Sequence, residues 1–167
     1  MQNLHPNFVH FPIAFLVIAI ILEVILLFWR RPEMDLTART LLFLGALGAV
    51  LATVSGWYGE QTLAPVAAAH DSIEFHKRLG FLTLGTVAIL SFWRAGTVRR
   101  GGPRPRWLFV AGMLGLAALL WNTAEEGGEL VYEYGVGTEL TAPEGPLAEE
   151  PTPRDSNQDV PRGEDFR

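Results

Sequence analysis

Four histidines are the residues of this sequence best suited to hold a metal ion or a haem iron. His5 and His10 bracket the stretch HPNFVH, and His70 and His76 bracket HDSIEFH. Imidazole nitrogens ligate zinc, copper and haem iron. The sequence contains no cysteine, which excludes thiolate metal sites, iron–sulfur clusters and c-type haem attachment within this chain. The chemistry that these residue types favour is therefore ligation by histidine.

The histidines border long apolar segments that must position them. In a chain of 167 residues with 49% hydrophobic residues, four uncharged or nearly uncharged runs stand out: Phe8–Trp29, Leu41–Trp57, Leu79–Trp93 and Trp107–Ala124. A helix of roughly 20 apolar residues crosses a hydrocarbon core, and the third run reaches that length if its helix begins near Phe75. The runs are apolar around their whole circumference, whereas the helices of a soluble bundle carry a polar stripe. The sequence predicts an all-α, integral membrane four-helix bundle.

The arginines predict how the bundle lies in the membrane. They gather in the first and third connections, at Arg30, Arg31 and Arg39 and at Arg94, Arg99, Arg100, Arg104 and Arg106. Because short cytoplasmic loops are rich in Lys and Arg, we expect both connections on the cytoplasmic side of a bacterial inner membrane, and both termini on its outer side. The basic loops are explained by topology, so no nucleic-acid partner is expected despite them.

The chain changes character at its C-terminal end. Residues 1–137 hold the apolar segments and form the predicted transmembrane domain, whereas residues 138–167 are acidic and rich in proline. Such a segment buries too little apolar surface to offset the entropy lost on ordering, so we expect a disordered tail. No internal repeat is visible in the sequence.

The predicted topology brings all four histidines to the outer end of the bundle. His10 and Ala14 stack on one face of the first helix, and His76 and Gly80 stack on one face of the third. In each helix a small residue one turn deeper leaves room for a flat group against the backbone. We therefore predict His10 and His76 as axial ligands of a b-type haem, with Ala14 and Gly80 providing clearance.

Other interpretations of the same residues stay open. His5 and His70 would form a second ligand pair, substitute for the first pair, or serve structural roles at the helix ends. The four histidines together with Glu60 or Glu126 would suit a transition metal such as zinc or copper. Small residues in transmembrane helices also serve close packing without any cofactor.

The sequence also predicts the surroundings of two further features, a carboxylate in the first apolar run and a glycine pair after the fourth. Glu23 lies inside the first apolar run, far from the histidines along the helix, so we expect it to contact an arginine of the basic loops. After the fourth run, the pair Gly127–Gly128 is expected to end the helix, with the following apolar residues folding back over the mouth of the bundle.

Three motifs give the chain a family resemblance. The stretches HPNFVHFPIA (5–14), HKRLG (76–80) and GGELVYEYGVG (127–137) resemble those of domain of unknown function family 2231, which comprises small bacterial membrane proteins. The resemblance implies four membrane helices and no established activity. Some members are joined to c-type cytochrome modules, which implies c-type cytochromes or subunits of a respiratory complex as partners besides the lipid bilayer.

The sequence leaves two classes of function. The first is an electron carrier that holds haem b between histidines at the outer face of the membrane. The second is a non-catalytic subunit or scaffold of a respiratory assembly, with structural histidines or a small metal ion. We find no nucleophile–base pair, phosphate-binding loop or HExxH motif, so the sequence favours a carrier or accessory protein over an enzyme.

Overall fold

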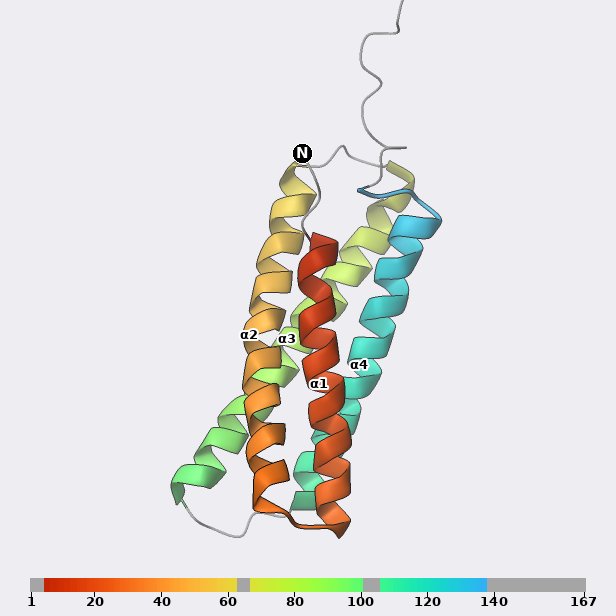
Figure 1. Cartoon of the computed structure of the whole chain (residues 1–167). Helices are drawn as coiled ribbons and strands as arrows, with labels where there is room; N and C mark the ends of the chain where they lie inside the picture. Colours follow the sequence, from red (N-terminus) through yellow and green to blue (C-terminus); the bar gives the residue numbers. More distant parts are fainter. Residues whose placement is uncertain (1–4, 63–66, 101–105, 138–167) are drawn as a thin grey trace, which may run out of the picture.

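The protein folds as an antiparallel helical bundle. The structure, a computed structural model, describes residues 5–62, 67–100 and 106–137. Within these residues the elements are α1 (His5–Phe28), α2 (Pro32–Thr62), the 3-10 turn η1 (Ala67–Ala69), α3 (His70–Arg100) and α4 (Arg106–Tyr132). Successive helices run in opposite directions along one bundle (Figure 1). The all-α bundle predicted from the sequence is confirmed, while the tail at 138–167 lies outside the described residues.

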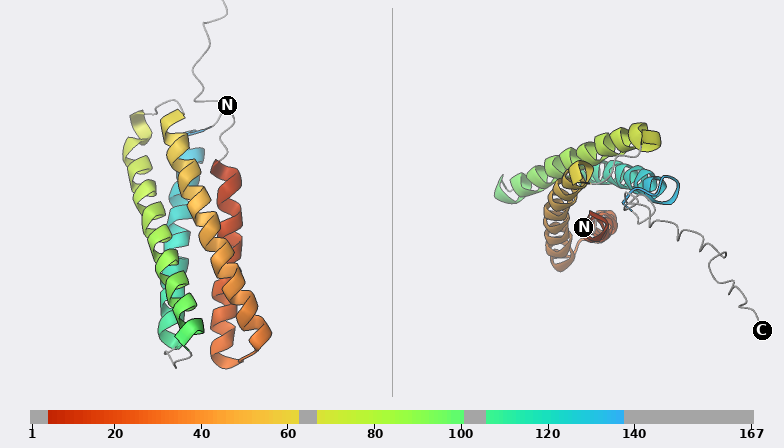
Figure 2. Two further views of the ribbon diagram at one scale, coloured as in Figure 1. Left: turned by 90° about the vertical axis from the view of Figure 1, so that its left-hand side faces the viewer. Right: turned by 90° about the horizontal axis from the view of Figure 1, so that it is seen from above.

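The two ends of the bundle differ in their polar residues. The first residues of α1 and α3 and the last residues of α2 and α4 lie together at one end (Figures 1 and 2), which we name the histidine end. Arg94 of α3 and Arg106 of α4 lie toward the opposite end, which we name the arginine end.

Each helix is longer than its apolar run. Pro32 is the first residue of α2, a position where the fixed φ angle and missing N–H of proline are favourable. Glu33 and Asp35 follow in the first turn, where carboxylates interact favourably with the helix dipole. The prediction that Gly127–Gly128 ends the fourth helix is wrong, because α4 continues to Tyr132. The chain turns after that point, where Gly135 and Gly137 take positive φ angles.

The outer surface of the bundle is apolar. Large hydrophobic side chains point outward along the helices, including Phe92 at 81% exposure and Ile89 at 66%. Each of the four described helices is long and apolar enough to cross a membrane. In water such a surface would drive aggregation, whereas in a bilayer it contacts lipid chains.

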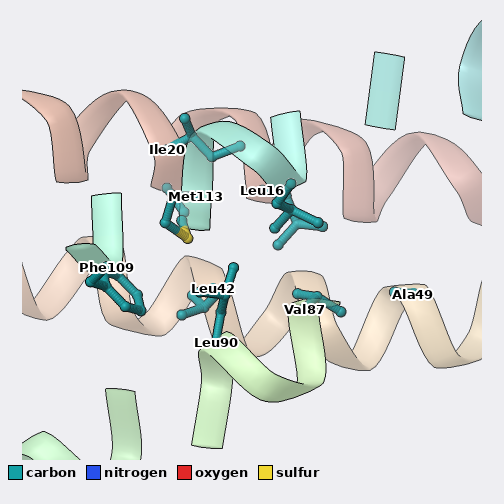
Figure 3. Close-up of a cluster of buried hydrophobic side chains, with 10 residues drawn as sticks. Leu16, Ile20, Leu42, Ala49, Val87, Leu90, Phe109 and Met113 are labelled. Atoms are coloured by element: carbon teal, nitrogen blue, oxygen red, sulfur yellow. The ribbon is translucent and has the colours of Figure 1, made fainter. Parts of the chain in front are cut away.

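An apolar core fills the middle of the bundle. All four helices contribute to it (Figure 3): Leu16, Ala19, Ile20, Leu42, Ala49, Val87, Leu90, Phe109, Met113 and Leu116. Glycines bring α1 and α2 into close contact, since a Cβ atom built on Gly45 would lie 2.6 Å from the Leu16 side chain. This glycine therefore serves the close packing of the two helices.

The two helical hairpins α1–α2 and α3–α4 repeat one pattern of burial. Asp35 and Arg106 lie 71 positions apart, and the same separation relates buried residues throughout the bundle. The buried pairs are Pro12 and Thr83, Leu16 and Val87, Ala19 and Leu90, Ile20 and Ser91, Ala38 and Phe109, Leu42 and Met113, Gly45 and Leu116, and Gly59 and Leu130. The matching burial indicates that the hairpins are parallel structural repeats, although the sequence shows no internal repeat. The likeness is approximate, because α3 leans outward at the arginine end (Figures 1 and 2).

Candidate functional site

His5 and His76 meet at the histidine end, on two helices that start at the same end of the bundle. Their ring centroids are 6.4 Å apart, and the ring planes are nearly perpendicular at 84°. Both residues are mostly buried. The two positions are equivalent in the hairpin repeat, since His76 also follows His5 by 71 positions. A residue that faces its own counterpart lies on or near a two-fold axis, so this pair marks the approximate axis of the bundle.

The imidazole of His5 packs against α2. A Cβ atom on Gly56 would lie 3.0 Å from His5 Cε1, so this glycine leaves the space that the ring occupies. Ser55 Oγ lies 3.0 Å from His5 Nδ1 and donates its own proton to the Ala52 carbonyl. Because a hydroxyl has a single proton, His5 Nδ1 is the donor to Ser55. Burial lowers the pKa of His5, while the Ala52 carbonyl acts in the opposite direction.

The imidazole of His76 packs against α4 in the same way. A Cβ atom on Gly127 would lie 3.0 Å from His76 Cε1, and Gly127 is the counterpart of Gly56 in the repeat. The presence of a glycine within α4 at this position is therefore explained, because a larger residue would collide with the ring. His76 Nδ1 is buried, and the described part of the chain offers it no hydrogen-bond partner of ordinary geometry.

Three of the other predicted site residues do not join this pair. His10, His70 and Ala14 are exposed, so His5 occupies the position beside His76 that we expected for His10. The reason is helical geometry: five residues turn a helix by about 140° beyond one full turn, so His5 and His10 cannot share a face. Gly80 lies one turn deeper than His76, and a Cβ there would meet no atom of the described residues within 4 Å.

A metal site with three or more protein ligands finds no support in the described part of the chain. No three side chains of His, Asp or Glu among these residues are grouped closely enough to hold a metal ion. Glu60, one of the carboxylates considered for such a site, instead pairs with Lys77 at 2.9 Å.

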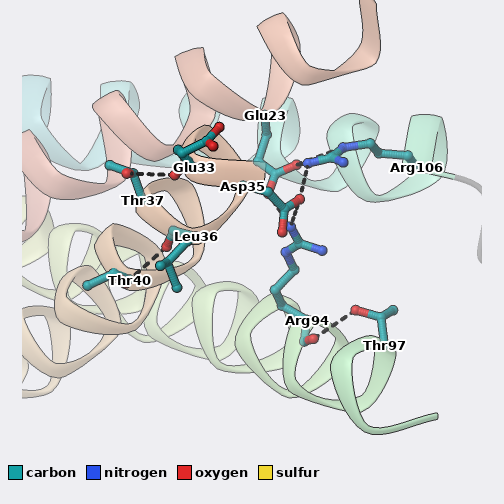
Figure 4. Close-up of polar contacts among 9 residues, drawn as sticks. All are labelled: Glu23, Glu33, Asp35, Leu36, Thr37, Thr40, Arg94, Thr97 and Arg106. Carbon is teal, nitrogen blue, oxygen red and sulfur yellow. Dashed lines mark hydrogen bonds and ion pairs between the residues drawn. The ribbon is translucent and has the colours of Figure 1, made fainter. Parts of the chain in front are cut away.

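The arginine end holds a compact ionic cluster. Glu23 is 1% exposed and lies 2.9 Å from Arg106 and 3.3 Å from Arg94. Asp35 lies 2.6 Å from Arg94 and 2.8 Å from Arg106. Figure 4 shows the two guanidinium groups beside the two carboxylates. The expected contact between Glu23 and arginines next to the basic loops is confirmed. We call these four residues the ionic tetrad.

The ionic tetrad follows the same repeat as the histidine pair. Arg94 is the counterpart of Glu23, and Arg106 is the counterpart of Asp35, each 71 positions later. The first hairpin supplies both acids and the second supplies both bases. Each residue contacts its own counterpart and the counterpart of the other residue of its hairpin, as expected for residues close to a two-fold axis. Histidine pair and ionic tetrad therefore mark two points along one axis, with the apolar core between them.

These features define an integral membrane bundle of two repeated hairpins with a histidine pair at one end. A family model described as "Predicted membrane protein (DUF2231)" matches residues 1–140, and the chain belongs to this family. No curated protein and no solved structure matches the chain.

Sequence reasoning missed the residues that position the histidines. Ser55, Gly56 and Gly127 lie 50 or more positions from their histidine partners along the chain, and only tertiary contacts reveal their roles. The sequence does contain one indication of these roles: His5 and Gly56 both have an identical residue 71 positions later, at His76 and Gly127. It was hidden because few other positions keep their residue type across the repeat.

Proposed function

We propose that this protein is an electron carrier that binds a b-type haem between His5 and His76. The observation that supports it is the 6.4 Å separation of the two ring centroids. Two imidazoles on opposite faces of one iron have centroids roughly 6 Å apart, given metal–nitrogen bonds of about 2 Å. Perpendicular ring planes are compatible with this arrangement, since each ring can turn about its own metal–nitrogen bond.

The surroundings of the pair suit histidine ligands. A ligating histidine generally donates its second ring N–H to a neighbouring acceptor, which fixes the ring and its tautomer. The contact between His5 Nδ1 and Ser55 Oγ at 3.0 Å supplies such an acceptor and leaves Nε2 as the ligating nitrogen. The open space above Gly80 provides room beside His76.

The protein's own residues hold the group and protect it. A bound haem supplies one-electron transfer. His5 and His76 bind and orient it, Gly56 and Gly127 let the rings lie against the helices, and the apolar core below keeps water out of the bundle. The histidine pair lies near one membrane surface, and this location suits exchange of electrons with a partner outside the bilayer.

We further propose that the histidine end faces the outer side of a bacterial inner membrane. The arginine end then carries the cytoplasmic loops, in agreement with the distribution of Arg along the chain. The electron-transfer partner in this proposal is a c-type cytochrome or another subunit of a respiratory assembly.

The test is a reduced-minus-oxidised difference spectrum of protein purified from cells supplied with haem. We expect a b-type α-band at one haem per chain, lost in His5→Ala and in His76→Ala. His10→Ala and His70→Ala are the matched controls, since these exposed histidines come from the same two helices, and both should keep the band. Absence of a band in the unmodified protein, or a band indifferent to His5→Ala and His76→Ala, would overturn the proposal in favour of a scaffold with structural histidines.

A further inference from the structure

The hairpin repeat points to a missing hydrogen bond in the histidine pair. His5 and His76 have the same setting: each ring lies over a glycine of its hairpin partner, with Cε1 closest, Nδ1 next and Nε2 farthest. The carbonyls that act on the two rings, those of Ala52 and Thr123, are also counterparts in the repeat. The two sites are therefore built alike down to the main chain.

The two rings differ at Nδ1. His5 Nδ1 has Ser55 Oγ as its partner at 3.0 Å, and Ser55 directly precedes Gly56. Among the described residues, His76 Nδ1 is buried without an acceptor at ordinary hydrogen-bond geometry, although the Thr123 carbonyl acts on this ring. A buried polar nitrogen without a partner is costly, so native proteins rarely leave one in that state.

The repeat identifies the residue that can supply the partner. The residue directly before Gly127 is Glu126, so it occupies the position of Ser55 in the second hairpin. The longer side chain of Glu126 reaches further than the serine hydroxyl, and the residue is only partly exposed. The nearby hydroxyl of Thr123 is already engaged, since it donates to the Leu119 carbonyl and pairs with Thr83.

We propose that the carboxylate of Glu126 accepts the Nδ1–H of His76 and is a positioning residue of the histidine pair. The pairing fixes the tautomer of His76 with the proton on Nδ1 and leaves Nε2 to face a ligand. A carboxylate also makes its histidine a stronger electron donor than a hydroxyl does. The two halves of the site are then chemically unequal: His5 is held by a neutral hydroxyl, and His76 by an anion.

The proposal can be tested without haem. In protein labelled with nitrogen-15 at histidine and held in detergent micelles, we expect a slowly exchanging, downfield Nδ1–H proton of His76, assigned by its loss in His76→Asn. Glu126→Ala should speed its exchange with solvent at least tenfold. Glu126→Gln keeps an oxygen acceptor and should retain the proton but move its resonance upfield, because the acceptor is neutral. Glu125→Ala, at the exposed neighbouring carboxylate, is the matched control and should change nothing.

A second measurement rests on the proposed function. With haem bound, Glu126→Ala should raise the midpoint potential and Glu125→Ala should leave it unchanged, because loss of the anion beside His76 disfavours the ferric state. An unchanged His76 proton in both Glu126 variants would overturn the inference and assign the Nδ1–H to the Thr123 carbonyl. A protein that never binds haem but shows the expected proton behaviour would overturn the proposed function and leave this inference standing.

Discussion

At the scale of single residues, two glycines shape the histidine site. Gly56 and Gly127 let the imidazoles of His5 and His76 lie where a Cβ atom would approach their Cε1 atoms to 3.0 Å. That distance is shorter than carbon–carbon contacts normally allow, so any side chain at these positions must displace the ring. The glycines thus determine which histidines can meet on the axis.

We expect Gly56→Ala to destabilise the protein. Overpacking costs about 1–3 kcal/mol, which exceeds the gain of about 1 kcal/mol from replacing glycine by alanine in a helix. Gly115→Ala is the control, since a Cβ there meets no atom within 4 Å, and it should be neutral or stabilising. Thermal unfolding followed by circular dichroism in micelles measures both. Equal melting temperatures for the two variants would contradict the packing argument.

The stability of the protein should fall on mild acidification because of His5. Its pKa is lowered from 6.5 in the folded state by burial, so the unfolded chain gains a proton here before the folded chain does. Stability is therefore fully present above about pH 6.5 and is lost as the pH falls toward the folded-state pKa. Between about pH 7 and pH 5, the free energy of unfolding of His5→Asn should depend less on pH than the free energy of unfolding of His10→Asn. The same slope in both variants would contradict this assignment.

At the scale of helices, the ionic tetrad ties α1 and α2 to α3 and α4. Removing one partner of a buried ion pair leaves the other charge without compensation and costs about 3–5 kcal/mol. Glu23 is almost completely buried and contacts both arginines, so it belongs to this class. The tetrad is neutral as a whole, and each of its charges has two partners of opposite sign.

We expect Glu23→Ala to lower the free energy of unfolding by about 3–5 kcal/mol. Glu33→Ala removes an exposed carboxylate at the same end of the bundle and should change stability by less than about 0.5 kcal/mol. Unfolding by SDS titration compares the two variants. A Glu23→Ala protein as stable as Glu33→Ala would show that the tetrad is better hydrated than its burial indicates.

The repeat makes a sharper test of the tetrad possible. Glu23→Arg with Asp35→Arg places four cations together and should abolish folding. Adding Arg94→Glu and Arg106→Asp exchanges the charges between the hairpins and restores every opposite-sign contact. We expect this fourfold variant to recover stable protein in membranes, as measured by gel-filtration of the detergent extract. If the fourfold variant yields no stable protein while Glu33→Ala does, the two hairpins differ more than their similar burial patterns indicate.

At the scale of the whole molecule, the membrane bundle was predictable and its internal symmetry was not. Apolar runs of about 20 residues report directly on membrane helices, because the bilayer fixes their length and excludes unpaired backbone. Glu23 was also assigned to the correct kind of partner, because a buried carboxylate needs a cation. The choice of His5 over His10 depends on where α1 starts and on its rotation against α2 and α3. The start and rotation of α1 depend on how it packs at Gly45 and Gly56. The periodicity of residues along a single helix gives no information about such contacts between helices.

The orientation of the bundle can be measured directly, since the chain contains no cysteine. Single cysteines at Arg31 and Glu133, both exposed, lie near opposite ends of the bundle. We expect an impermeant maleimide applied to intact bacterial cells with a permeabilised outer membrane to label Glu133→Cys and spare Arg31→Cys. The reverse pattern would place the histidine end in the cytoplasm.

The division of the tetrad between the hairpins has a consequence for biosynthesis. The ribosome makes Glu23 and Asp35 first, and Arg94 and Arg106 emerge only with the second hairpin. Until then the two carboxylates of the first hairpin lack the arginines that contact them in the folded bundle. A hairpin of two spans returns the chain to its starting side, so the second hairpin enters in the same orientation. Its arginines reach the side of the membrane where the waiting acids lie, and assembly of the two halves is thereby coupled to the order of synthesis.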